Sequence, residues 1–495
     1  MLPFIQNFPM ICIWLCILCG LCCLMLSSNS ARRLALVVYT VQVMLSAILL
    51  AYTLQLGISY TYPMGHFPAP FNNELRAGPL EALIALLFST VMLLSLMGGT
   101  DDIERDIEEY NRGNYYIMTS MLFAAQLVII YTNDLFTAFV FIELLTLGAC
   151  SIIAIKQNGK TLVATMWYLI MSLVGGGLLL LSVSMLYGVT GHLLMPGLAE
   201  TIPALAATGK YTLPLFIVTG LLCVSLGIKA ALFPFHSWLP GAYASATTAS
   251  SAILSGLVGK SYIFLMIKLF VRVYGAETMA LLRITDILLI MGVLGLFFGS
   301  LHAIRQKDIK NMLAYSSVAQ IGYIFIGIGM NNVAGLMGAC FHIIVHATGK
   351  SMLFSAAGSL AAASGNKGDW NSLRGSGRRD ILAGIAFTCG ALSLIGIPPF
   401  PGFVAKMYLA SASSGTSFVP LVMISVLVVG TLMNTIYYLP AVLCIYARSG
   451  DSYTVKSSAA NRIALVIFIA ICFGLGMFSQ PVVKIIETGL MLFGM

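Results

Sequence analysis

Charged residues are scarce in this chain. Asp, Glu, Lys and Arg make up 9% of its 495 residues, whereas hydrophobic residues make up 59%, and the mean hydropathy is +0.95. These values exclude a soluble globular protein and indicate a polytopic membrane protein embedded in a lipid bilayer. Apolar segments and the short loops between them use up the chain, so no soluble domain of ordinary size is expected.

Motifs for redox or nucleotide chemistry are also missing. The sequence has no phosphate-binding glycine loop after a strand, no Cys-x-x-Cys pair in a polar loop and no haem motif. We therefore expect no cofactor in this chain and no redox chemistry of its own, so its energy must come from a partner subunit or an ion gradient. The net charge of +8 requires no nucleic acid, because the basic residues lie in loops or inside the apolar segments.

A cleavable signal peptide and a metal site are not expected either. The first apolar segment, 11–26, follows no basic residue and is long enough to remain as a span. All eleven cysteines fall in apolar segments, and Cys12, Cys16 and Cys19 share a helix face that could bind a soft metal. Because no other ligand types accompany them, we interpret these cysteines as small apolar residues facing lipid or neighbouring helices.

About 20 apolar residues are needed to cross a bilayer as a helix. By this measure the sequence predicts an all-α protein with about fourteen transmembrane helices. The predicted spans are 8–26, 34–57, 79–98, 115–132, 134–155, 165–189, 213–233, 247–271, 284–304, 314–330, 333–363, 383–411, 418–446 and 462–480.

Proline-containing segments interrupt the seventh and twelfth spans. Phe233-Pro234-Phe235-His236 ends the seventh, and Ile397-Pro398-Pro399-Phe400-Pro401-Gly402 divides the twelfth. Proline removes a backbone donor, and broken backbone at membrane depth persists only inside protein or beside a wet cavity. The breaks fall at matching places if spans 4–8 and 9–13 are two inverted five-helix repeats. This predicts an N-terminal segment 1–110, repeats 111–275 and 276–447, and a final segment 448–495.

Loop charges predict the orientation. Basic residues concentrate in the odd-numbered loops, which places those loops in the cytoplasm and both termini outside, in the inner (cytoplasmic) membrane of a cell. The odd loops contain Arg32, Arg33, Arg105, Arg112, Lys156, Lys160, Arg305, Lys307, Lys310, Lys367, Arg374, Arg378, Arg379, Arg448, Lys456 and Arg462, against Arg76, Lys210, Arg272 and Arg283 in the even loops. The acidic loop 101–106 is expected to be solvated or to bind a basic partner.

Ionisable residues inside the spans are the strongest functional signal. Each costs roughly 2.5–3.5 kcal/mol on insertion scales, so such groups usually mark proton or ion pathways. They are Glu143, Lys229, Lys260, Lys350 and Lys406. Burial disfavours a charged lysine and a nearby carboxylate favours it, by ~3 kcal/mol at about 5 Å. We therefore hypothesise that movement of Glu143 relative to Lys229 loads or releases a proton.

Span 11 adds two histidines to this set. His342, His346 and Lys350 follow at intervals of four and share a helix face. Two histidines at this spacing could bind zinc, but no further ligand is nearby, and a proton pathway suits groups that titrate near neutrality. Three other groups have open interpretations: Lys268 is expected to extend to the interface, and His236 and His302 could open a half-channel or be structural.

These segments together resemble the antiporter-like membrane subunits shared by respiratory complex I, Mrp cation/proton antiporters and membrane-bound energy-converting hydrogenases. The resemblance rests on FIELLTL, IKAALFPFHSWLPGAYASA, IRQKDIKNMLAYSSVAQIGY, FHIIVHATGKSMLFSAAGSL and GIPPFPGFVAK. It implies that Glu143 and Lys229 couple in one half-channel, that Lys260 is the central relay, continued by His342, His346 and Lys350, and that Lys406 ends the other half-channel.

Two functions remain open at this point. The first is a proton-translocating subunit of a multi-subunit complex such as an NADH:quinone oxidoreductase or a hydrogenase, driven by a peripheral redox module. The second is the D-type subunit of an Mrp Na+/H+ antiporter. Both imply other membrane subunits, protons and a lipid bilayer as partners, with Na+ as a further possible substrate. A purely structural membrane anchor is disfavoured by the buried charges.

Overall fold

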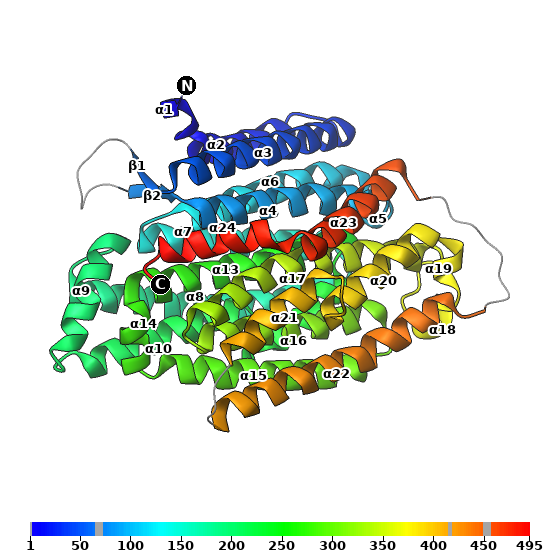
Figure 1. Cartoon of the computed structure of the whole chain (residues 1–495). Helices are drawn as coiled ribbons and strands as arrows, with labels where there is room; N and C mark the ends of the chain where they lie inside the picture. Colours follow the sequence, from blue (N-terminus) through cyan, green and yellow to red (C-terminus); the bar gives the residue numbers. More distant parts are fainter. Residues whose placement is uncertain (1, 65–72, 414–417, 449–456) are drawn as a thin grey trace.

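The computed structural model describes residues 2–64, 73–413, 418–448 and 457–495, and its helices pack side by side in one bundle (Figure 1). Twelve helical segments of these residues are long and apolar enough to cross a membrane, and α2 and α20 are shorter apolar helices. Each predicted span overlaps one of them, so the prediction of a helical membrane protein is confirmed. Lys456 lies outside the described residues.

The chain forms the following elements in order. The first half contains α1 (Leu2–Ile5), α2 (Phe8–Cys23), α3 (Ser28–Leu56), β1 (Tyr60–Met64), β2 (Asn73–Ala77), α4 (Pro79–Gly98), α5 (Thr100–Asp106), α6 (Glu109–Tyr131), α7 (Leu135–Ala154), α8 (Gly159–Thr190), α9 (Met195–Ala207), α10 (Thr212–Lys229), η1 (Phe235–Ser237), α11 (Trp238–Ser245), α12 (Thr248–Ile253), η2 (Leu254–Val258), α13 (Gly259–Ile267) and η3 (Lys268–Tyr274). The second half contains α14 (Gly275–Leu281), α15 (Ile284–Ile304), α16 (Ile309–Gly329), α17 (Val333–Ala362), α18 (Trp370–Leu373), α19 (Ser376–Arg379), α20 (Ile381–Ile395), α21 (Pro401–Ala412), α22 (Phe418–Tyr446), α23 (Ala459–Met477) and α24 (Ser479–Met491).

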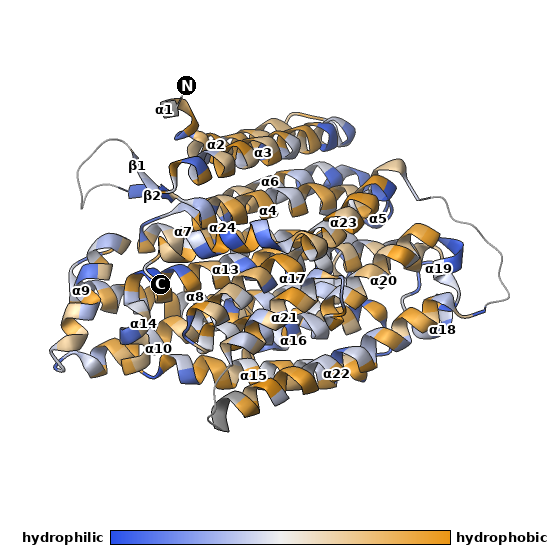
Figure 2. Cartoon of the chain, viewed as in Figure 1, coloured by the Kyte–Doolittle hydropathy of each residue, from blue (hydrophilic) through white to orange (hydrophobic). Residues whose placement is uncertain are grey.

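Central and peripheral helices differ in burial. The most apolar window of segment 248–281 is 100% buried and those of α16 and α17 are 94% and 89% buried, whereas α8, α15 and α22 reach 39%. Hydrophobic residues cover most of the long helices, and hydrophilic residues gather in short segments at the ends of the bundle, such as α19 (Figure 2). An ionisable group on a central helix is therefore enclosed by protein and cannot face lipid.

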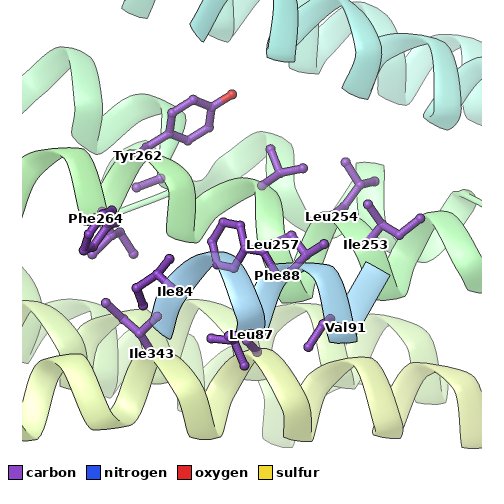
Figure 3. Packing of buried hydrophobic residues seen from close by; sticks show 14 of the residues in the cluster. Ile84, Leu87, Phe88, Val91, Ile253, Leu254, Leu257, Tyr262, Phe264 and Ile343 are labelled. Carbon is purple, nitrogen blue, oxygen red and sulfur yellow. The ribbon is translucent and has the colours of Figure 1, made fainter. Parts of the chain in front are cut away.

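The core around the central helices is tightly packed. Ile84, Phe88 and Val91 of α4 lie beside Leu257 of η2 and Ile343 of α17 (Figure 3). A Cβ added to Gly256 would lie 3.1 Å from Val91 Cγ1 and 3.3 Å from the Ala347 carbonyl oxygen. The missing side chain thus permits the close approach of η2 to α4 and α17.

The predicted break in the seventh span is confirmed. Helix α10 ends at Lys229, Ala231 has a φ of +57°, and the chain resumes as η1 and α11. The Trp238 indole donates to the Ile228 carbonyl oxygen at 3.0 Å, so it satisfies an acceptor near the end of α10.

The predicted break in the twelfth span is also confirmed. Helix α20 ends at Ile395, Gly396 has a φ of +90°, and α21 begins at Pro401. A left-handed glycine is a common helix terminator because it has no Cβ to clash.

Several elements were not predicted. A hairpin pairs Tyr60 with Ala77 in antiparallel register, the segments η2 and η3 are π-helical, and α24 follows the last predicted span. The acidic segment 101–106 is part of helix α5 rather than a solvated loop. Its carboxylates make ion pairs with Arg32, with Lys156 and with Arg105 of the same helix.

Candidate functional site

Glu143 and Lys229 are brought together from α7 and α10. Lys229 Nζ lies 3.0 Å from Glu143 Oε1 and donates to Thr146 Oγ1 at 2.9 Å. The Lys229 side chain is 0% exposed, whereas that of Glu143 is 29% exposed. The Lys229 amine is thus enclosed by protein, while the Glu143 side chain is partly exposed at the surface of the protein.

A glycine makes room for this carboxylate. A Cβ added to Gly176 of α8 would overlap Glu143, lying 2.9 Å from its Cδ. Helix α8 therefore packs directly against the Glu143 carboxyl group. The Gly175-Gly176-Gly177 run was a visible signal, but the sequence alone did not connect it to Glu143.

Lys260 lies next to the π-helical segment η2. Its amine donates to the carbonyl oxygen of Ser255, five residues earlier, and the Ser255 hydroxyl lies 3.0 Å from that of Ser317. The residue is 1% exposed. A π-turn widens the helix locally, and such turns occur frequently at functional sites.

Lys350 lies in a cluster of hydroxyl groups. Its amine donates to the Leu313 carbonyl oxygen at 2.7 Å, Ser316 Oγ at 2.8 Å and the Tyr438 hydroxyl at 3.2 Å. The Ser316 and Tyr438 hydroxyls are themselves 2.7 Å apart. Three acceptors match the three donors of an ammonium group.

His342 and His346 form stacked rings, with centroids 6.4 Å apart. His342 Nε2 lies 3.0 Å from Gln320 Oε1, and both ring nitrogens of His346 are without a hydrogen-bond partner among the described residues. Both rings are fully buried. A neutral imidazole offers one donor and one acceptor, and among the described residues no hydrogen bond joins the two rings.

Lys406 is held by the break in its own span. Its amine donates to the Ile395 carbonyl oxygen, at the end of α20, at 2.7 Å and to Thr431 Oγ1 at 3.0 Å. It also lies 4.6 Å from the centroid of the Tyr323 ring. A Cβ added to Gly396 would lie 2.9 Å from Lys406 Cδ, so the glycine also makes room for the side chain.

The central groups form a connected set. Lys260 interacts electrostatically with His342, His346 and Lys350, and Lys406 interacts with His342. Tyr323 lies between Lys406 and His342, with ring centroids of Tyr323 and His342 5.5 Å apart. Among the described residues, the charged partner of Lys229 is Glu143. The backbone next to this pair lies close to that of Lys260, because a Cβ added to Gly259 would lie 3.9 Å from the Ala230 carbonyl oxygen.

Lys268 differs from its prediction. It does not extend to the interface but is fully buried, and its amine donates to the carbonyl oxygens of Ile130 at 2.9 Å and Thr132 at 2.6 Å. These carbonyls lie at the C-terminal end of α6, where backbone acceptors lack helical partners. Lys268 therefore caps α6.

His236 and His302 are neighbours, with ring centroids 6.4 Å apart. His302 stacks on Tyr315 at 5.2 Å and its Nδ1 lies 2.8 Å from the Phe298 carbonyl oxygen. No group of three or more His, Cys, Asp or Glu side chains that could hold a metal occurs in the part of the chain that the structure describes.

Sequence comparison identifies the family of the chain. A family model described as the transmembrane region of NADH:quinone oxidoreductase and Mrp antiporter proteins matches residues 132–433. This stretch contains all seven proposed site residues. The chain belongs to this family of membrane subunits.

Two curated relatives of the family differ in the complexes their names describe. The NADH-quinone oxidoreductase N subunit of Desulforudis audaxviator is 34% identical over 395 residues, covering 79% of this chain and 76% of that protein. The D-type Na(+)/H(+) antiporter subunit of Bacillus subtilis is 28% identical over 369 residues, covering 74% of this chain and 72% of the relative.

Solved structures show the same fold. A chain of an archaeal membrane-bound sulfane sulfur reductase matches with a TM-score of 0.86 at 22% identity, covering 99% of this chain and 97% of the other. A chain of the Mrp complex from Dietzia matches at 0.84 and 20% identity, covering 99% and 98%. A chain of complex I from Thermus thermophilus matches at 0.73 and 22% identity, covering 96% and 98%.

Proposed function

We propose that this membrane protein is a proton-translocating subunit of a multi-subunit complex. Protons would move through two half-channels, one at Glu143 and Lys229 and one at Lys406, joined by Lys260, His342, His346 and Lys350. A peripheral redox module would drive the transfer. The repeats would span 111–275 and 276–447, and both termini would lie outside the inner (cytoplasmic) membrane.

The close Glu143–Lys229 pair, with its enclosed amine, is the observation that carries this proposal. At 3.0 Å, attraction between a carboxylate and an ammonium is about 5.5 kcal/mol at an effective dielectric near 20, and partial exposure of Glu143 reduces it. A membrane potential supplies about 2.3 kcal/mol per charge per 100 mV. Because these energies are comparable, separation of the pair is a feasible coupling step.

The test is proton transport by the assembled complex in membrane vesicles, followed with a pH-sensitive dye. Glu143→Gln and Lys229→Ala are each expected to lower the rate by at least about tenfold, since each removes one member of the pair. Lys484→Ala is the matched control, because Lys484 is exposed on α24. Wild-type transport in both pair variants would contradict the proposal.

The second candidate is the D-type subunit of an Mrp-type Na+/H+ antiporter. Its support is the 28% identity with the D-type antiporter subunit of Bacillus subtilis over most of both chains. Purification of the complex separates the two candidates: co-purifying iron–sulfur or nickel proteins indicate the redox-driven complex. Membrane subunits alone, with Na+ dependence of the pH change in vesicles, indicate the antiporter.

A further inference from the structure

The last span ends in a bend between two helices. Helix α23 ends at Met477, Phe478 adopts a non-helical conformation with φ −117° and ψ 51°, and α24 begins at Ser479. The predicted span 462–480 ends three residues beyond Met477, directly before Pro481. The bend lies outside the two proposed repeats.

The C-terminal end of α23 packs directly on the break of the twelfth span. A Cβ added to Gly476 would overlap the Pro399 carbonyl oxygen and lie 3.0 Å from the Phe400 carbonyl carbon. The Phe473 ring of α23 also contacts the Phe400 ring, with centroids 5.0 Å apart. Helix α23 thus holds the segment 397–400 through one glycine and one aromatic ring.

The segment 397–400 is also linked to Lys406. The segment joins Ile395, whose carbonyl accepts the Lys406 amine at 2.7 Å, to α21, which carries Lys406. Gly402 of α21 approaches the Ser393 carbonyl so closely that a Cβ there would overlap it. Since Pro398 and Pro399 have fixed φ angles, the segment has little freedom to absorb a displacement.

We propose that Gly476 is a positioning residue for Lys406. Its missing side chain allows α23 to lie against the Pro399 carbonyl, and that contact keeps the end of α20 and the start of α21 at the spacing that the Lys406 bond to Ile395 requires. The groups facing Lys406 from the other packed helices are Tyr323 of α16, Thr431 of α22 and His342 of α17. The inference rests on the proposed function, because it assumes that Lys406 carries protons.

The experiment compares two glycines of α23 in the assembled complex. Gly476→Ala is expected to lower proton transport per complex by about 10-fold to 100-fold, the scale of an ångström-level displacement of a reacting group, and to shift the pH dependence of the rate. Gly474→Ala is the control, because a Cβ there meets nothing within 4 Å; it should match the wild type in both. A loss of stability would lower the amount of active complex without shifting the pH dependence of its rate, so the pH dependence separates it from a displacement of Lys406.

Each result decides the matter. If Gly476→Ala and Gly474→Ala behave alike, or if the pH dependence does not shift, the inference is wrong. If Gly476→Ala prevents assembly, Phe473→Leu serves instead, since it removes the contact with Phe400 without adding atoms; wild-type transport and pH dependence in that variant overturn the inference. Lys406→Met separates failure of the proposed function from failure of the positioning role. Wild-type transport in Lys406→Met refutes the proposed function. Loss of transport in Lys406→Met, together with normal transport in Gly476→Ala, refutes only the positioning role.

Discussion

Lys229 and Lys406 both lie beside a broken helix, but they are held in different ways. Lys229 is the last residue of α10, before its break, and faces a carboxylate from another helix at 3.0 Å. Lys406 follows its break and faces the carbonyl oxygen at the end of the preceding helix at 2.7 Å. The described residues place no carboxylate within ion-pair distance of Lys406.

The difference indicates that the charges of the two lysines are controlled in two different ways. Glu143 is a side chain on the edge of the protein, so rotation can remove its charge from Lys229. The Ile395 carbonyl belongs to the backbone, so it moves only if the break itself changes shape. Hydrogen bonds to a charged group contribute about 1.5–3 kcal/mol, less than a close ion pair, and the second site therefore depends more on geometry than on charge.

The largest effect should come from placing a carboxylate at each lysine position. Lys229→Glu puts a second carboxylate opposite Glu143 and should abolish transport, because like charges at this distance repel strongly. Lys406→Glu meets no fixed charge among the described residues and can donate to Ile395 when protonated, so it should retain measurable transport. Equal loss of vesicle proton transport in both variants would break the comparison.

A smaller effect should follow removal of one hydroxyl at each site. Thr431→Val deletes a 3.0 Å acceptor of Lys406, and Thr146→Val deletes a 2.9 Å acceptor of Lys229. Since a hydrogen bond contributes about 1 kcal/mol, we expect about a fivefold lower rate for Thr431→Val. Thr146→Val should lose less, because Glu143 remains. The transport rates of the two variants measure this order. A larger loss in Thr146→Val than in Thr431→Val would show that the charge of Lys406 is better stabilised than that of Lys229.

The smallest effect concerns an ion pair outside the spans. Asp106 Oδ2 lies 2.8 Å from Lys156 Nζ. Burial acts to raise the pKa of Asp106, but the hydrogen bonds and charges of Lys156 and Arg105 hold it below its ordinary value. The stabilisation is therefore present above about pH 4, the ordinary pKa of Asp, and is lost as the pH falls further.

Asp106→Asn should lower the free energy of unfolding at neutral pH by about 0.5–1 kcal/mol without changing transport. Thermal unfolding of the purified complex measures the first and vesicle assays the second. Glu108→Gln, an exposed residue two positions along the chain, is the control. Altered transport in Asp106→Asn would show that the Asp106–Lys156 pair is not purely structural and does not differ from the Glu143–Lys229 pair in this respect.

Much of the fold followed from local sequence properties. Apolar run length predicted the spans, and prolines near Phe233 and Pro398 predicted the two breaks. The hairpin at Tyr60–Met64 escaped because its strands are short and lie between long apolar runs. The end of α23 was predicted to within three residues, but the contact of Gly476 and Phe473 with Pro399 and Phe400 was not, because it joins segments far apart in the chain.

The candidate site was predictable only in part. The buried ionisable residues were evident because charge is so rare in apolar helices. Their partners were not, since Thr146, Ser316, Tyr438 and Thr431 are ordinary polar residues of helices far apart in the chain. Lys268 shows the limit of the approach: its place near the end of a predicted span indicated a side chain that extends to the interface, yet it is buried and caps the end of α6.

The sequence by itself determined which residues are costly to bury, because hydration of a charge depends on the side chain and on the apolar length around it. Tertiary structure alone decided which of those charges meets a carboxylate, a carbonyl or a hydroxyl, because these partners are supplied by separate helices and act only over a few ångströms. Glu143 reaches Lys229 because Gly176 leaves space for it, and Lys406 reaches Ile395 because α20 stops there.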